Sequence, residues 1–299
     1  MTVNSNDTGK TQHVNSLSVC ILASGSRGNA IHISNGTTEI LIDAGLSGVE
    51  IERRLRSRGL LPENLTAVLV SHEHADHIQG VGVLSRKYGL PVFINADTRT
   101  AATSIGKIKD IRPFSCGAPF IINELRIRPF SISHDAADPS GFTLEQGDLK
   151  IGIATDLGIA TTLVKEHLKK CAILVLEANH DPEMLEKGPY PWPLKQRIKS
   201  RAGHLANEDT RILLSELQHD HLRHVVLAHL SETNNTPQKA FDAVCPALTR
   251  CTPTLSVALQ GKSSEIFTVC CTSRKKEKMK PTFPFSACTT GASCTGINL

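Results

Sequence analysis

The run His72-Glu73-His74-Ala75-Asp76-His77 carries three imidazoles and two carboxylates directly after the apolar stretch AVLVS at residues 67–71. Alternate residues of an extended chain share one side, so His72 and His74 can approach one cation at the roughly 2.0–2.1 Å typical of a zinc–nitrogen bond. Asp76 and His77 would then turn towards a second ion. A polar loop that is rich in histidine by chance is the alternative, but packing gives no reason for such a run. The run therefore predicts a two-metal centre.

Three more candidate ligands each end a strand-like stretch. His134 follows SIS, Asp156 follows IAT, and His229 follows VVLA. An α/β scaffold gathers side chains from distant parts of the chain at its strand ends. We therefore expect these three residues to join the histidine-rich run in one site.

Short β-type stretches alternate with turns and helical segments between residues 16 and 272, and we expect one α/β domain there. Two mixed sheets face each other in this prediction, with helices outside. The segments 1–15 and 273–299 are rich in polar residues, and we expect both to be loosely ordered tails. The predicted helices include residues 77–88, 97–105 and 207–217, whereas residues 190–193 are predicted to be a proline-rich loop.

The bulk composition agrees with a cytoplasmic protein. No apolar run approaches the roughly 18 to 20 residues that cross a bilayer, and the N-terminus has no apolar signal segment, so we expect no membrane association. Nine cysteines without a Cys-x-x-Cys pair indicate reduced thiols. The net charge of +4 permits a polyanionic substrate. Only 4% of the residues are aromatic, so a stacking platform for single strands is not evident.

The order H-x-H-x-D-H, then His, Asp and His at strand ends, resembles the full ligand series of the metallo-β-lactamase superfamily. The resemblance runs from about residue 17 to residue 269 and implies the αβ/βα four-layer sandwich of that fold. It implies two divalent ions, with zinc favoured and manganese or iron as alternatives. An aspartate at position 156, where the true β-lactamases carry cysteine, argues against antibiotic hydrolysis. The implied ligands are His72, His74 and His134 for one ion, Asp76, His77 and His229 for the other, and Asp156 between them.

Further stretches are similar to one branch, the YycJ/WalJ-type proteins, which are related to ribonuclease Z. This resemblance implies exonucleolytic or related phosphodiester hydrolysis of nucleic acid, with DNA favoured, by a hydroxide shared between the two metals. Thioester hydrolysis of the glyoxalase II kind uses nearly the same ligands and is the alternative, although two of the stretches, LEANHD and GHLAN, argue against it. The oligomeric state stays open. The matching stretches are SGSRGN (24–29), LIDAG (41–45), LEANHD (176–181), GPYPW (188–192), GHLAN (203–207) and HLSETNN (229–235).

Several residues have predicted roles beside the metals. By resemblance to the nuclease members, Glu177 would orient His204, whose imidazolium would protonate the leaving oxygen, and Asp76 would also orient the hydroxide. Asp43 ends a strand and is suited to accept a hydrogen bond from a ligand imidazole, although a simple turn aspartate is the alternative. Asn207 is predicted to cap the helix that follows His204. Ala206 departs from the branch, which usually has serine there.

Substrate contacts are the least defined prediction. Ser26 and Asn29 lie in a glycine-bracketed turn that could aim backbone N–H groups at a phosphate, or that could be a plain hairpin turn. His180 either lines the cleft or is a turn histidine paired with Asp181. The loop 187–201 carries five cations and the aromatic residues Tyr190 and Trp192, which would contact phosphates and bases if the loop covers the metals. In the alternative, Trp192 fills the core and the lysines form a solvated helix face.

Overall fold

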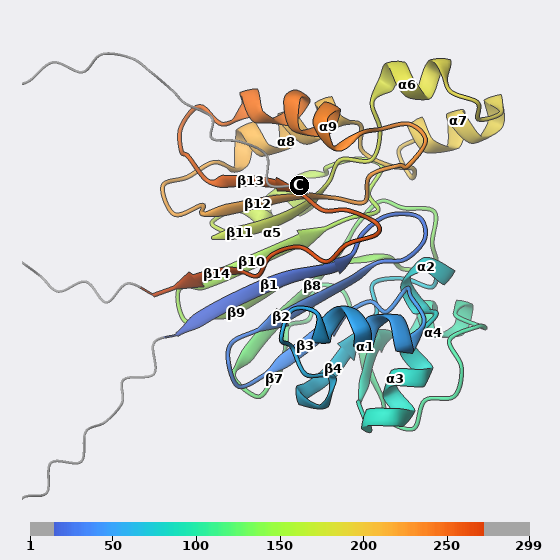
Figure 1. Ribbon diagram of the computed structural model, residues 1–299, viewed down its shortest axis with the longest axis vertical. Helices are drawn as coiled ribbons and strands as arrows, with labels where there is room; N and C mark the ends of the chain where they lie inside the picture. Colours follow the sequence, from blue (N-terminus) through green and yellow to red (C-terminus); the bar gives the residue numbers. More distant parts are fainter. Residues whose placement is uncertain (1–14, 272–299) are drawn as a thin grey trace, which may run out of the picture.

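The computed structural model describes residues 15–271, and the tails predicted at 1–15 and 273–299 lie almost wholly outside this range. Two seven-stranded sheets pack face to face (Figure 1). The first sheet has the order β14 (Phe267–Cys270), β1 (Ser16–Ala23), β2 (Ala30–Ser34), β3 (Glu39–Ile42), β4 (Leu65–Leu69), β5 (Val92–Asn95) and β6 (Ile111–Phe114). The second has the order β13 (Thr254–Val257), β12 (His224–Ala228), β11 (Ile173–Glu177), β10 (Leu149–Ala154), β9 (Ser140–Gln146), β8 (Leu125–Ser131) and β7 (Phe120–Ile122).

Helices cover the outer faces of both sheets, so the fold is the predicted four-layer sandwich (Figure 1). The helices of the first half are α1 (Gly48–Arg56), α2 (Ala75–Ile78), α3 (Val81–Tyr88) and α4 (Ala96–Ala101). Those of the second half are α5 (Thr162–Leu168), α6 (Pro182–Lys187), α7 (Trp192–Lys199), α8 (Asn207–Leu217) and α9 (Pro237–Val244). In the residues that the structure describes, no helix has the length and apolar character needed to span a membrane.

Three apolar clusters hold the layers together. The central one lies between the sheets and includes Leu69, Phe142 and Val226, each almost fully buried. A second packs β10–β12 against α5, α8 and α9, and a third packs β3–β5 against α1 and α3. Removal of this apolar surface from water, at about 25 cal/mol per Å², is the main force that favours the sandwich.

Parallel pairing places the predicted site residues at one edge. β3 and β4 are parallel, and so are β10, β11 and β12. The carboxyl ends of parallel strands meet at the same edge of a sheet. Asp43, Asp156 and His229 follow β3, β10 and β12 directly or one residue later, and Glu177 ends β11. The candidate site residues of both sheets therefore lie at one end of the sandwich.

Some predicted elements differ from the structure. The helix predicted at 77–88 is interrupted at Gly80, because the Gly80 N–H donates to Ala44 O at 2.7 Å and a Cβ there would lie 2.4 Å from Leu46 O. The helix predicted at 97–105 is shorter, since Asn95 caps it by accepting from Thr98 N at 2.8 Å and it ends at Ala101. The edge strands β6 and β7 were not predicted.

The proline-rich segment agrees with its prediction in part. Residues 190 and 191 lie in the predicted loop, whereas residues 192 and 193 begin α7. This loop joins α6 to α7, and the two helices lie together at the end of the sandwich where α2 also lies (Figure 1). Pro182 and Pro193 lie in the first turns of α6 and α7. Proline is tolerated there because the N–H that it lacks would have no acceptor within the helix. Asp181 caps α6 by accepting from Met184 N at 2.8 Å.

Candidate metal centre

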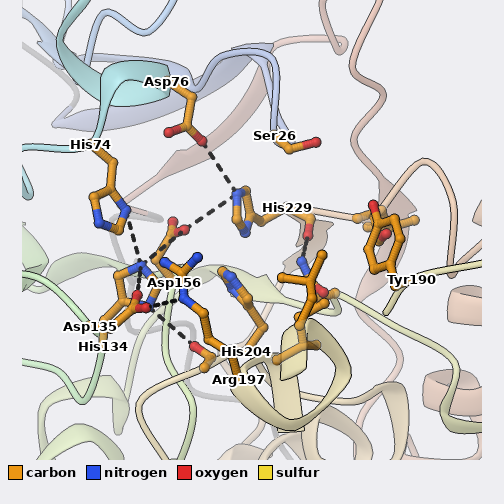
Figure 2. A pocket seen from close by; sticks show the side chains of 16 residues that line it. Ser26, His74, Asp76, His134, Asp135, Asp156, Tyr190, Arg197, His204 and His229 are labelled. Carbon is orange, nitrogen blue, oxygen red and sulfur yellow. Dashed lines mark hydrogen bonds and ion pairs between the residues drawn. The ribbon is translucent and has the colours of Figure 1, made fainter. Parts of the chain in front are cut away.

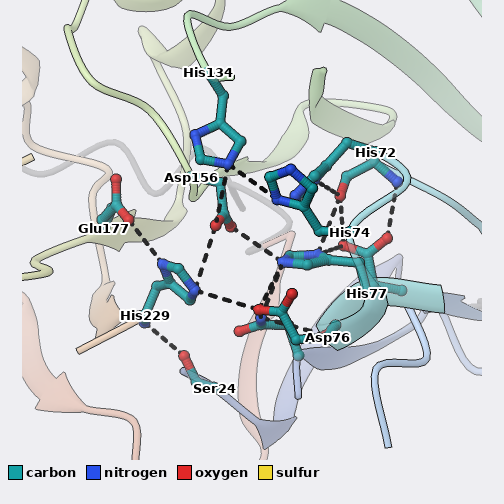
Figure 3. A network of polar contacts seen from close by, with 12 residues as sticks. Ser24, His72, His74, Asp76, His77, His134, Asp156, Glu177 and His229 are labelled. Carbon is teal, nitrogen blue, oxygen red and sulfur yellow. Dashed lines mark hydrogen bonds and ion pairs between the residues drawn. The ribbon is translucent and has the colours of Figure 1, made fainter. Parts of the chain in front are cut away.

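The seven predicted metal ligands converge, as Figure 3 shows. The candidate ligand atoms of His72, His74 and His134 lie within 4.8 Å of one another, and so do those of Asp76, His77 and His229. Asp156 lies between the groups. Its Oδ1 is 3.3 Å from His229 Nε2 and 4.0 Å from His134 Nε2, and its Oδ2 is 3.5 Å from His77 Nε2. The side chains are thus grouped as expected from the sequence, and their role as metal ligands stays a prediction.

Unpaired buried atoms test whether this cluster fits cations. His72 Nε2, His229 Nε2 and Asp156 Oδ2 are buried and have no hydrogen-bond partner within the described residues. His74 Nδ1 and His134 Nε2 face each other at 3.4 Å. Burial of a polar atom without a partner costs roughly 1–3 kcal/mol, so such atoms rarely cluster without a reason. Five nitrogen and oxygen lone pairs directed into one space are a fitting donor set for divalent cations.

Hydrogen bonds fix the tautomers of the histidines. Asp43 Oδ2 can only accept, so His77 Nδ1, at 2.8 Å, carries the proton. His134 Nδ1 donates to Gly203 O at 3.2 Å. Ser71 donates its hydroxyl to Asp43 Oδ2 at 2.7 Å, and its oxygen therefore accepts from His72 Nδ1 at 2.9 Å. In the neutral form of each ring, Nε2 then carries no proton, which is the form that a metal requires.

The electrostatics of the cluster also favour positive charge. Burial lowers the pKa of His77, but the carboxylates of Asp156 and Asp43 outweigh it and raise that pKa to about 9. Burial likewise opposes protonation of His229, yet Asp156, Asp76 and Glu177 hold its pKa well above the usual value. Without metal the carboxylates thus retain an extra proton on His77 and on His229, whereas burial lowers the pKa values of His72 and His134. Cation binding must displace these protons and is therefore expected to weaken as the pH falls.

Glu177 and His204 form the predicted pair beside the metal ligands. Glu177 is fully buried, and its Oε1 accepts from His204 Nδ1 and from His229 Nδ1, both at 2.8 Å. Its Oε2 accepts from the backbone N–H groups of Leu157 and Leu205 at 2.9 and 3.1 Å. Burial raises the pKa of Glu177, but the two imidazoles and these bonds hold it well below the ordinary range. One carboxylate thus orients a candidate metal ligand and the candidate acid together.

A cavity of about 260 Å³ opens over the ligands (Figure 2). The walls come from β-strand ends on one side and from α7 and the segment before it on the other. Arg197 reaches into the cavity from α7 and forms an ion pair with Asp135, the neighbour of His134. Tyr190 lines the wall, whereas Trp192 is 61% exposed, so the reading of Trp192 as core filler is wrong. The lining residues include Ser26, His74, Asp76, Asp156, Asn179, Leu194, Ile198, His204 and His229.

The predicted substrate contacts are placed unequally. Ser26 lines the cavity and is exposed. Asn29 does not line it: the side chain is buried, its oxygen accepts from Gly25 N at 2.9 Å, and its Nδ2 lies 2.9 Å from His77 Nε2. His180 is also buried and outside the lining, with its Nδ1 unpartnered rather than bonded to Asp181. Ser26 therefore remains the one candidate substrate contact of the three.

Two other sequence expectations have definite outcomes. Asp43 accepts from His77, as predicted. Asn207, by contrast, is the first residue of α8, and its side chain bonds Asn235. The position before the helix is Ala206, which provides no side-chain cap. Ser71 was missed, although a hydroxyl placed between Asp43 and His72 is the kind of strand-end polar residue that orients metal ligands.

Comparison with known proteins agrees with this geometry. The Beta-lactamase superfamily domain model matches residues 38–230. Exodeoxyribonuclease YycJ of Bacillus anthracis is 38% identical over 231 residues, covering 76% of this chain and 88% of that protein. Exodeoxyribonuclease WalJ of Streptococcus pneumoniae is 37% identical over 225 residues, covering 74% and 84%. The metallo-β-lactamase fold protein YhfI from Bacillus subtilis has a TM-score of 0.67 at 16% identity, over 85% of this chain and 100% of that one. The chain therefore belongs to the metallo-β-lactamase superfamily of metal-dependent hydrolases, and within it is similar to the YycJ/WalJ proteins.

Proposed function

We propose that this protein is a metal-dependent phosphodiester hydrolase that degrades DNA from an end, as the names of its YycJ and WalJ relatives say of those proteins. The observation that carries the phosphodiester chemistry is His204, held by the buried Glu177 next to the ligand cluster and open to the cavity. An acid in this position suits a reaction that expels an alkoxide, because such a leaving group needs a proton.

The donor set supports two divalent cations, with zinc favoured and manganese or iron as alternatives. His72, His74 and His134 would hold one ion, and Asp76, His77 and His229 the other, with Asp156 shared. Bound in this way, the ions would lower the pKa of a coordinated water to roughly 7 and offset the charge on the phosphoryl oxygens.

The chain's own groups would complete the reaction. Asp76 is partly exposed and lines the cavity. Its carboxylate would accept a hydrogen bond from the attacking water and so orient that water. His204 would hold the proton to be transferred at Nε2, and the Glu177 carboxylate, which accepts from Nδ1, orients the ring for this step. Transfer of that Nε2 proton to the leaving oxygen is worth typically 10² to 10⁴ in rate.

The test is digestion of end-labelled DNA by the purified full chain, together with its metal content. Successive shortening of duplex or single-stranded DNA that stops on chelation and returns with zinc or manganese is the expected result. His204→Asn should keep its metal and lose activity. Intact DNA and RNA beside rapid cleavage of a glutathione thioester would contradict the proposal and favour the glyoxalase II-like reaction.

A further inference from the structure

The SGSRGN loop between β1 and β2 is not a backbone phosphate cradle. The N–H of Gly25 donates to Asn29 Oδ1, that of Arg27 to Gln260 Oε1, that of Gly28 to Gly25 O, and that of Asn29 to Asp76 O. These donors are therefore committed inside the protein. What the loop presents to solvent are the side chains of Ser26 and Arg27.

The loop is held tightly where it meets the metal ligands. Gly28 has a φ of +154°, and a Cβ there would lie 2.7 Å from Gly45 O. Gly45 in turn lies directly against Asp76, since a Cβ on Gly45 would be 1.6 Å from Asp76 O. The backbone at Ser26 and Arg27 is thus fixed relative to the metal centre, and only the two side chains are free to adjust.

A second, open hollow of about 400 Å³ begins at this loop. It shares Ser26 and Asp76 with the catalytic cavity, so the two hollows meet at a metal ligand. Asp76 is the one acidic residue in the lining, and Arg27 is the one cation. The lining consists of Ser26, Arg27, Ala75, Asp76, Gln79 and Ser104.

Arg27 makes an ion pair that a phosphate could replace. Its guanidinium lies 2.7 Å from the Glu232 carboxylate, and the two side chains are 74% and 38% exposed. Exposed pairs of this kind contribute little, typically below about 1 kcal/mol, and salt screens them. A phosphate can accept two N–H bonds from one guanidinium and carries more negative charge than a carboxylate. Glu232 therefore holds Arg27 at the rim of the hollow without making it unavailable.

We propose that this hollow binds the part of the nucleic-acid strand that continues beyond the reacting nucleotide, with Arg27 as its phosphate contact and Glu232 as the competing anion. The inference rests on the proposed function, and it adds a path for the strand: the cavity beside Tyr190 and Arg197 and the hollow beside Arg27 adjoin at Ser26 and Asp76, which line both. Gln79 and Ser104 provide neutral hydrogen-bonding groups along that path.

The test uses opposite substitutions in the metal-loaded full chain. Arg27→Ala should weaken binding of a short single-stranded DNA with hydrolysis-resistant phosphorothioate linkages on the order of tenfold. The slope of log affinity against log salt should fall by about 0.7, the value for one lost phosphate contact on a single strand. Glu232→Gln should have the opposite effect and tighten binding, because it removes the competing anion. Arg27→Lys should restore the salt slope. The matched controls are Arg112→Ala and Asp110→Asn, which break an exposed ion pair whose members line neither hollow.

The sign of the two effects separates the possible outcomes. If the pair only ties two loops together, Arg27→Ala and Glu232→Gln will change affinity in the same direction, and the subsite is refuted. Wild-type protein that digests DNA while Arg27→Ala binds like the control variants also refutes the subsite and leaves the proposed function standing. Wild-type protein that neither binds nor digests DNA overturns the proposed function, and the subsite with it.

Discussion

Glu177→Gln is the substitution that examines the centre most directly, because the Glu177 carboxylate receives four hydrogen bonds and donates none. Oε1 accepts from the Nδ1 atoms of His204 and His229, and Oε2 accepts from the N–H groups of Leu157 and Leu205. A glutamine has the same shape but must place an NH₂ group at one of these positions. In either orientation of the amide, its NH₂ group will face two N–H donors, either those of the two imidazoles or those of the backbone.

The consequences follow from which pair is disturbed. If the amide nitrogen faces the backbone, two buried N–H groups lose their acceptor, at roughly 1–3 kcal/mol each. If it faces the imidazoles, Nδ1 must become an acceptor, and the proton moves to Nε2. His229 then no longer presents a lone pair at Nε2, and His204 loses the carboxylate oxygen that orients its ring. We expect metal affinity to fall by about 10- to 100-fold and turnover at saturating metal to fall by about 10² to 10⁴.

Two measurements on the same preparation separate these effects. Competition with a chromogenic chelator gives the zinc affinity, and DNA digestion with excess metal gives the turnover. His204→Asn is the matched variant, since it should reduce turnover by a similar factor with wild-type zinc affinity. A folded Glu177→Gln protein that binds zinc and digests DNA like the wild type would refute the orienting role of this carboxylate.

Three other substitutions probe stability around the site. Ala206→Ser should raise the free energy of unfolding by about 1 kcal/mol in urea titrations, because α8 has no side-chain cap at this position; an unchanged value would contradict the capping argument. Burial lowers the pKa of His180 to about 4, so below pH 6.5 the unfolded chain takes up a proton that the folded chain refuses until about pH 4. Stability should therefore fall by about 2 kcal/mol between pH 7 and pH 5, and His180→Gln should remove that part of the fall when unfolding is compared at these two pH values. Gly45→Ala should yield protein with little bound zinc, since the new Cβ would lie 1.6 Å from Asp76 O; a normal zinc content would show that the backbone yields without moving Asp76.

The ligand set could be predicted from the sequence because its signal is local. Apolar periodicity marks the strands, and parallel pairing brings their carboxyl ends to one edge, so a polar residue directly after each strand is a candidate for the site. His72, Asp156 and His229 were found in this way, and so was the orienting residue Asp43. Each identification needed only a strand and the residue that ends it.

The errors came from features that depend on contacts distant in sequence. Gly80 interrupts the predicted helix because its N–H bonds Ala44, which no local pattern reveals. Asn207 has a side chain suited to capping a helix, but this side chain forms a hydrogen bond with Asn235 instead. Asn29 looked like a phosphate contact because the loop is rich in glycine, yet those N–H groups are satisfied within the protein. Local propensity ranks the possible partners of a polar group, and the tertiary fold decides which partner it meets.

Backbone strain links the fold to the chemistry of this centre. Asp43, Asp156 and His229 have φ values of 59°, 58° and 56°, the left-handed region that non-glycine residues avoid at a cost of about 1–3 kcal/mol each. Each of the three follows a strand of the parallel part of a sheet. Glycine would relieve the strain, but it has no imidazole or carboxylate to contribute. In each case the residue in the left-handed region itself carries a side chain that faces the cluster. The hydrogen bonds that Asp43 accepts from Ser71 and His77, and that His229 donates to Glu177, offset part of this strain and orient the candidate ligands.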